Sequence, residues 1–143
     1  MKNYEMLKLD NQLCFPLYAC SRKVVNHYTP LLKPLGLTYT QYIVFLVLWE
    51  QKSATVGELC NRLCLDNGTL TPLLKKMEKE GHITRTRSSN DERIVTVSLT
   101  DQGWALREKA AEVPPQAASC VNLNREEAGL LYKLLYKLLK SDP

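Results

Sequence analysis

The segment from Asp66 to Gly103 constrains the fold most, because a helical pattern in it gives way to a strand pattern. Asp66 is suited to cap a helix, apolar residues then recur at helical spacing, and Gly81 is suited to end it. From Ile83 onward the period of the pattern becomes two: Ile83, Arg85 and Arg87 lead into a Ser-Ser-Asn-Asp turn at 88–91, and apolar residues alternate with polar ones over 95–100. We therefore predict a helix followed by a two-stranded hairpin whose loop forms a wing.

The predicted helix carries small polar and basic residues opposite its apolar face. Such side chains can reach base edges and phosphates, whereas a merely solvated face more often carries paired Glu and Lys. Arg93 could either enter the minor groove or pair with Asp91 and fix the loop. The candidate DNA-binding residues on the helix and hairpin are Asn67, Thr69, Thr71, Lys75, Lys76, Arg85, Arg87, Asp91 and Arg93.

A shorter helix directly upstream completes a DNA-binding motif. Its capping box is Thr55-x-x-Glu58, and Leu59 and Leu63 lie on its apolar face. A helix, a short turn at Leu65-Asp66 and a basic helix are the parts that place side chains in a major groove. The predicted fold is mainly α with a small β-hairpin wing, a winged helix-turn-helix at about residues 38–100.

Two helices are expected before this motif. The first begins either at Asp10 or Asn11, where Pro16 would distort its first turns, or at Phe15, where Pro16 would take the favoured first position. It runs toward Tyr28, and the prolines and glycine at 30, 34 and 36 predict a broken connector. A second helix over 40–50 is almost wholly apolar, which places it in the centre of the fold.

Helices are also expected after the wing. One runs from Trp104 to about Val113 and is interrupted by Pro114-Pro115; a capping box at Asn124 then opens a last helix with six leucines. That is more apolar surface than a domain of 143 residues usually covers, so we expect a second copy to pack against it. The dimerisation helices would span about residues 8–35 and 101–141 of a single domain at 1–143.

Charge and hydropathy narrow the class of protein. The net charge is only +4, from 19 basic and 15 acidic residues, so a nucleic-acid surface must be local. No apolar run approaches the roughly 20 residues that span a bilayer, and the first residues lack the apolar core of a secretory signal. We expect a cytoplasmic protein with no membrane partner.

The five cysteines are an odd number without the spacing of a disulfide framework, which favours free thiols. Cys60 and Cys64 could share a helix face, but no second Cys or His pair completes a tetrahedral metal site. We therefore predict no metal and no other cofactor, and expect Cys20, Cys60 and Cys64 to be buried as small apolar side chains.

These elements, with the Asp91-x-Arg93 spacing in the wing turn and the phrase SLTDQG at 98–103, resemble the MarR family of bacterial repressors over nearly the whole chain. Within that family, LDNQLCFPLYACSR at 9–22, TYTQY at 38–42, LW at 48–49 and LDNGTLTPLLKKMEKEG at 65–81 are similar to the branch of organic hydroperoxide resistance regulators. The resemblance implies a winged-helix dimer that binds operator DNA.

The resemblance also assigns a redox site. It implies that Cys14 is the peroxide-sensing thiolate, that Tyr28 and Tyr39 contact it from the partner subunit, and that Cys120 resolves it as an intersubunit disulfide; one-cysteine members instead bind a low-molecular-weight thiol. Pro16 departs from the usual apolar residue at its place. A helix N-terminus favours a thiolate, which supports Cys14 on physical grounds.

The predicted function is therefore a dimeric repressor that senses an organic hydroperoxide or a related oxidant through Cys14. One alternative is a repressor of the same family that a small phenolic or other ligand releases without redox chemistry. A second is a thiol peroxidase that turns over at Cys14. A DNA-reading helix and wing would serve no purpose in such an enzyme, so we predict that the protein is not one.

Overall fold

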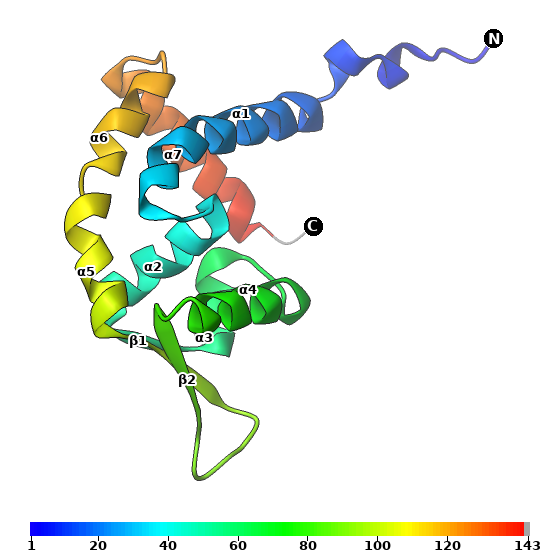
Figure 1. Ribbon diagram of the computed structural model, residues 1–143. Coiled ribbons are helices and arrows are strands. Elements are labelled where there is room, and N and C mark those ends of the chain that lie inside the picture. Colours follow the sequence, from blue (N-terminus) through cyan, green and yellow to red (C-terminus); the bar gives the residue numbers. More distant parts are fainter. Residues whose placement is uncertain (142–143) are drawn as a thin grey trace.

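The computed structural model describes residues 1–141, which form seven α-helices and a small three-stranded sheet (Figure 1). Short 3-10 turns lie at Glu5–Leu7, Leu9–Asn11, Lys33–Leu35 and Ala118–Cys120. The helices and strands in chain order are α1 (Cys14–Leu32), α2 (Tyr39–Gln51), β1 (Ser53–Thr55), α3 (Val56–Leu63), α4 (Asn67–Lys79), β2 (Ile83–Arg87), β3 (Val95–Leu99), α5 (Asp101–Ala110), α6 (Val113–Ala117) and α7 (Arg125–Lys140).

Helix α2 is the central element of the core, as its apolar sequence predicts. Val44, Phe45 and Leu48 are fully buried, and they belong to one cluster with the apolar faces of α3 and α4. A capping box opens α2: the Thr38 hydroxyl accepts from the Gln41 backbone N–H, and the Gln41 side chain accepts from the Thr38 backbone N–H. The helix therefore begins at Tyr39, one residue before the predicted start.

The sheet is antiparallel with strand order β1-β3-β2. The predicted hairpin is present as β2 and β3, with Arg87 opposite Val95, but the prediction of only two strands was incomplete. Strand β1 pairs Ser53 with Ser98 on the other edge of β3. Three residues are too few to show an alternating pattern, which is why the sequence did not reveal this strand.

Helix α1 begins at Cys14, between the two predicted starts, and Pro16 is its third residue. The first four N–H groups of a helix have no partner within it, so the proline removes no hydrogen bond there. The predicted break at Thr29-Pro30 was wrong. Pro30 lies inside the last turn, where one hydrogen bond is lost without ending the helix, and the chain turns only at Gly36, whose φ is +70°.

Two predicted boundaries after the wing were also wrong. Helix α5 begins at Asp101 rather than Trp104, because the Thr100 hydroxyl accepts from the Gly103 N–H and caps the helix. It ends at Ala110, before the two prolines, which stand in the first turn of α6, where a proline needs no N–H partner.

No single helix within residues 1–141 is long and apolar enough to cross a membrane. Only α1 together with α2 meets that requirement by length and composition, as a pair bent by 71°, and α2 is buried in the protein core.

Candidate DNA-binding surface and thiol site

A groove of about 530 Å³ lies between the start of α3, the exposed face of α4 and the wing. It brings together six of the nine residues that the sequence nominates for DNA binding. It also includes Thr55, Val56 and Gly57, which sequence reasoning did not nominate, although the capping box at 55–58 marks them as a helix start. The six nominated residues are Asn67, Thr71, Lys75, Arg85, Arg87 and Arg93.

The start of α4 is fixed by Asp66. Its carboxylate accepts a hydrogen bond of 2.9 Å from the backbone N–H of Thr69. Hydrogen bonding from the Thr69 side chain, and then from its backbone N–H, holds the pKa of Asp66 below its usual value. The cap makes Asn67 the first residue of the helix, with its side chain exposed. At the other end Gly81 has a φ of +84°, so the predicted glycine stop is confirmed.

Arg93 closes the tip of the wing. Its Nε and Nη2 donate to the two carboxylate oxygens of Asp91 at 3.0 and 3.1 Å, and the backbone N–H of Arg93 donates to the same carboxylate. This is the second of the two predicted arrangements. Arg87 supports the loop from the strand, because its Nη1 donates to the Glu92 carbonyl at 2.9 Å.

Arg85 joins the wing to α4. Its Nη2 lies 3.1 Å from Glu78 Oε1, and its backbone N–H donates to Glu78 Oε2 at 2.9 Å. These hydrogen bonds lower the pKa of Glu78. The contact gives Arg85 an anchoring role beside the predicted one. The three nominated residues outside the groove lining are Thr69, Lys76, which lies 4.0 Å from Glu80, and Asp91.

Cys14 is exposed at the first position of α1, and Tyr28 follows fourteen residues later on the same helix. At the helical rise these positions are about 21 Å apart along the axis. Within one chain, the Cys14 thiol is therefore too far from Tyr28 to contact it.

Tyr28, Tyr39 and Tyr42 form an aromatic cluster where α1 meets α2. The ring of Tyr28 lies edge-on to Tyr39 at 5.2 Å between centroids and 5.7 Å from Tyr42. Burial raises the pKa of each of the three hydroxyls, and Cys120 raises that of Tyr28 further. Two predicted sensor residues, Tyr28 and Tyr39, are therefore in contact in one chain, and Cys120 is near enough to affect the pKa of Tyr28. Tyr42 was not nominated, although the phrase at 38–42 contains it.

The tyrosine cluster is connected to α4 through a buried amide. Gln41 is 1% exposed, and its Nε2 donates to Glu80 Oε2 at 3.2 Å, at the C-terminal end of α4. Gln41 stands between Tyr39 and Tyr42 in the first turn of α2. A displacement of that turn would therefore be transmitted to the C-terminal end of α4.

An extended apolar surface covers α7 and the first half of α1. Every residue of α7 is exposed apart from the half-buried Ala128. The large exposed apolar side chains on these two helices are Phe15, Leu17, Tyr18, Val24, Leu130, Leu131, Tyr132, Leu134, Leu135, Tyr136, Leu138 and Leu139. In Figure 1 this half of the molecule lies at the end opposite the wing.

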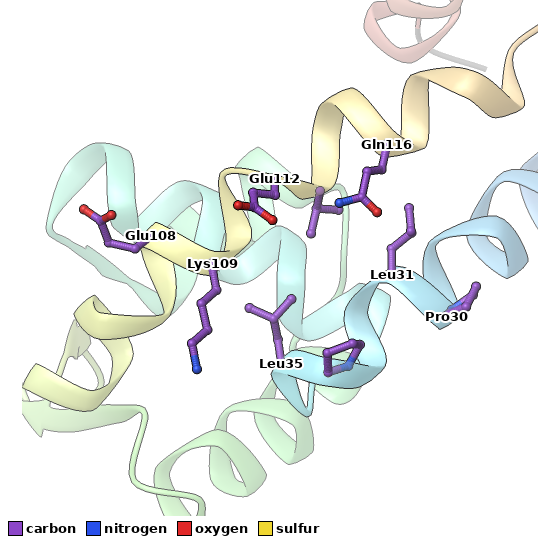
Figure 2. A pocket seen from close by; sticks show the side chains of 9 residues that line it. Pro30, Leu31, Leu35, Glu108, Lys109, Glu112 and Gln116 are labelled. Carbon is purple, nitrogen blue, oxygen red and sulfur yellow. The ribbon is translucent and has the colours of Figure 1, made fainter.

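A second hollow, of about 510 Å³, separates the end of α1 from α5 and α6. In Figure 2, Leu31 and Leu35 project from the α1 side toward the segment that carries Lys109, Glu112 and Gln116. The hollow therefore lies between α1, which carries Tyr28, and α5, the helix that follows the wing.

The expected burial was wrong for two of the three remaining cysteines. Cys20 is exposed on α1 and Cys64 is exposed at the end of α3, whereas Cys60 is half-buried and packs against the hydrophobic core. The prediction failed because α1 has one face outside the core and Cys64 lies beyond the last turn of α3. Over residues 1–141, no three His, Cys, Asp or Glu side chains gather as metal ligands would.

A three-stranded sheet, a basic helix and a groove between helix and wing define a winged helix-turn-helix protein. The sequence profile of the family described as transcriptional regulator SarA/Rot matches residues 26–110. The organic hydroperoxide resistance transcriptional regulator of Bacillus subtilis is 46% identical over 138 residues, which cover 96% of this chain and 94% of that protein. The chain therefore belongs to the MarR family of winged-helix transcriptional regulators, in the branch of the organic hydroperoxide resistance regulators.

Solved structures agree with this assignment. One is AbfR of Staphylococcus epidermidis, in its overoxidised form bound to DNA. It is 37% identical to this chain with a TM-score of 0.78, and the match covers 95% of this chain and 96% of AbfR. Disulfide-formed AbfR has a TM-score of 0.67 at 36% identity over the same shares. A cysteine-to-serine variant of E. coli MarR with operator DNA has a TM-score of 0.82 at 26% identity, covering 97% and 99%.

Proposed function

We propose that the protein is a homodimeric repressor that leaves its operator when an organic hydroperoxide oxidises Cys14. The observation that carries this proposal is the division of the sensor residues along α1. Cys14 stands exposed at one end, while Tyr28, Tyr39 and Cys120 lie together near the other. A second copy that packs antiparallel along α1 would bring its Cys14 to these residues.

The exposed apolar surface of α1 and α7 supports such a dimer. Leucines alone give α7 a broad apolar face, and monomeric proteins rarely leave so large a patch in water. A twofold axis would let each chain cover the same surface of the other.

The chemistry needs two steps. The Cys14 thiolate attacks the O–O bond of the hydroperoxide, so that the cysteine is oxidised to a sulfenic acid and the hydroperoxide is reduced to an alcohol. The thiol of Cys120 from the other chain then attacks the sulfenic sulfur, which forms a disulfide and releases water. A low-molecular-weight thiol would form a mixed disulfide in the same way. The disulfide-formed structure of AbfR supports a route that ends in a disulfide.

The tyrosines are suited to stabilise the thiolate. Burial raises the pKa of Tyr28 and Tyr39, so both hydroxyls stay protonated at neutral pH and can donate hydrogen bonds to an anion. We assign Cys14, Tyr28, Tyr39 and Cys120 to sensing. Operator contacts come from the residues of α4 that line the groove, with Asn67 and Thr71 facing bases and Lys75 facing phosphates, and from the wing.

A gel shift with the promoter region of the protein's own gene tests the proposal. We expect the reduced protein to bind, one equivalent of cumene hydroperoxide per subunit to release it, and dithiothreitol to restore binding. Retention of the operator after complete oxidation of Cys14 would contradict the proposal. An operator is cytoplasmic, so we place the protein there, acting as one unit over residues 1–143.

The hollow in Figure 2 favours one alternative, release by a small ligand without redox chemistry. Its volume falls in the range of small-molecule sites. Release of the Cys14→Ser variant by a phenolic compound such as salicylate, at the concentration that releases wild type, would support it. Consumption of many hydroperoxide equivalents per subunit would instead indicate a peroxidase.

A further inference from the structure

The turn between α3 and α4 holds two thiols that the sensor mechanism does not use. Cys60 is half-buried in the last turns of α3, and its Sγ donates a hydrogen bond of 3.4 Å to Asn67 Oδ1. Asn67 is the first residue of α4 and lines the groove between helix and wing. A thiol hydrogen therefore helps to orient a side chain at the DNA-reading surface.

Cys64 is the second thiol, and it is exposed. It ends α3 in the left-handed conformation, with a φ of +53°, and its backbone N–H donates to the Cys60 carbonyl. Glycine usually takes such a position, because a side chain there is strained, and strain of this kind gathers at functional sites. The backbones of the two cysteines are thereby held one turn apart.

The separation of the pair suits a disulfide. Residues four apart on an α-helix have Cα atoms roughly 6 Å apart. Disulfides join Cα atoms up to about 6.8 Å apart. One partner is open to solvent and the other lies beside it, which is the arrangement of an attacking thiol and a resolving thiol.

We propose that Cys60 and Cys64 form a second thiol switch, which small-molecule disulfides close into an intrasubunit disulfide and which weakens operator binding. The proposal rests on the proposed function in one respect only, the reading of DNA by the start of α4. The Cys60–Cys64 pair is separate from Cys14 in position, because the turn between α3 and α4 lies in the half of the molecule that carries the wing (Figure 1). It also differs from Cys14 in the class of oxidant.

The exchange proceeds in two balanced steps. The Cys64 thiolate attacks one sulfur of the small disulfide, which forms a mixed disulfide and expels one small thiolate. The Cys60 thiol loses its proton to water and attacks the Cys64 sulfur, which forms the protein disulfide and expels the second small thiolate. The protein is oxidised by two electrons, and the small disulfide is reduced to two thiols.

Closing the disulfide removes the hydrogen that Cys60 donates to Asn67. The Asn67 oxygen loses its partner, and the Cys60 sulfur turns toward residue 64. Side chains at the start of a recognition helix read bases, and loss of one such contact lowers affinity roughly tenfold. We expect a loss of that size in operator affinity.

The test uses the full-length protein with Cys14, Cys20 and Cys120 replaced by Ser, so that Cys60 and Cys64 are its only thiols. The probe is 2-hydroxyethyl disulfide. Trypsin cleaves after Arg62, between the two cysteines, so the disulfide is expected to join peptides 53–62 and 63–75 until reductant is added. A chain that stays monomeric on a non-reducing gel places the bond within one subunit.

We expect joined peptides together with a roughly tenfold loss of operator affinity that dithiothreitol reverses. Adding Cys64→Ser should abolish both effects. Two unmodified thiols, a mixed disulfide that is never resolved, or a disulfide with unchanged affinity would each overturn the proposal. If the triple variant does not fold, the same peptides are followed in wild type after alkylation of its free thiols.

Cumene hydroperoxide separates this proposal from the one for Cys14. The triple variant should hold its operator at one equivalent per subunit, while wild type is released. A wild type that ignores the hydroperoxide contradicts the Cys14 sensor and leaves the result with 2-hydroxyethyl disulfide unaffected.

Discussion

Arg93 and Asp91 form a two-point ion pair at the tip of the wing, two residues apart in the chain, with both oxygens of the carboxylate engaged by the guanidinium. The Arg93 side chain is 90% exposed, so the pair organises the loop rather than burying a charge. The two side chains therefore act on the wing as a unit.

We expect Asp91→Asn and Arg93→Ala to weaken operator binding by similar small factors, within about threefold, because either change opens the same loop. Fluorescence anisotropy with a labelled operator measures both. A much larger loss for Arg93→Ala alone would mean that the guanidinium reaches DNA. Unchanged affinity in an Arg87→Ala, Arg93→Ala double variant would exclude any contribution of the wing.

The same pair predicts how the wing responds to acid. The Arg93 guanidinium lowers the pKa of Asp91, so the folded wing binds the proton more weakly than an unfolded chain does. Its stabilisation is complete above the ordinary aspartate value, about 3.9, and is lost as pH falls through the lowered pKa. The protection factor of the Arg93 amide, which is the intrinsic exchange rate at each pH divided by the observed rate, should stay constant from pH 7 to about pH 4 and fall below that. A fall between pH 7 and pH 5 would contradict this assignment.

Neutral variants of the two lysines on α4 should weaken binding to all DNA sequences alike. Lys75 lines the groove, so Lys75→Gln should reduce the slope of log affinity against log salt by about one unit. Lys76→Gln should change it by no more than that, since Lys76 lies near Glu80. A sequence-dependent loss for Lys75→Gln would indicate base contact instead.

Replacing Leu134 and Leu138 together with Asp should give monomeric or unfolded protein without operator binding. Both side chains lie on the apolar face of α7 and are exposed in one chain. The matched control is Lys133→Glu with Lys137→Glu, on the basic face that adjoins the leucines, which should remain a dimer. Sedimentation velocity distinguishes the two species. A dimeric aspartate variant would place the interface elsewhere.

Variants of Cys14 and Cys120 distinguish the two redox routes, an intersubunit disulfide and a mixed disulfide with a small thiol. Cys14→Ser should hold the operator at a hydroperoxide dose that releases wild type, because the oxidisable thiolate is gone. Cys120→Ser should still form the sulfenic acid and release DNA incompletely, or be capped by a small thiol. Non-reducing gels of oxidised wild type should show a covalent dimer that either change removes. Released wild type that remains monomeric on the gel would indicate a one-cysteine sensor.

Gln41→Leu should lower the free energy of unfolding by about 1–3 kcal/mol, because it removes half of the α2 capping box and the bond to Glu80. It should also weaken operator binding, since it frees the end of α4. Thr40→Ala, one residue earlier and exposed, is the control and should change little. Chemical denaturation followed by circular dichroism measures the loss. Equal stability of the two variants would remove Gln41 from this role.

The elements that could be predicted are those with a local signal. Asp66 and Gly81 mark the two ends of α4, and alternation from Ile83 marks the hairpin. Strand β1 was not predicted, because its three residues derive their conformation from a partner strand more than forty residues away. The break predicted at Pro30 was wrong for a related reason. The helix continues past Pro30 because packing offsets the cost of one lost hydrogen bond near its end.

The candidate sites divide in the same way. A basic helix face and an arginine hairpin can be recognised from spacing, so most of the nominated groove residues meet in space. The pairing of Arg85 with Glu78 and the burial of Gln41 against Glu80 depend on how α4 meets β2 and α2. No local pattern encodes such a meeting. The sensor residues were found through family resemblance, and their separation along α1 follows from helix geometry alone.

Strand β1 limits what can move when the protein binds DNA. It joins the outer edge of β3 directly after α2 and before the capped start of α3, and Arg85 fixes β2 on α4. The angle between the wing and α4 is therefore set within one chain and stays constant. A change of fit to DNA must then come from turning one whole unit against another, or from bending of the DNA to meet it.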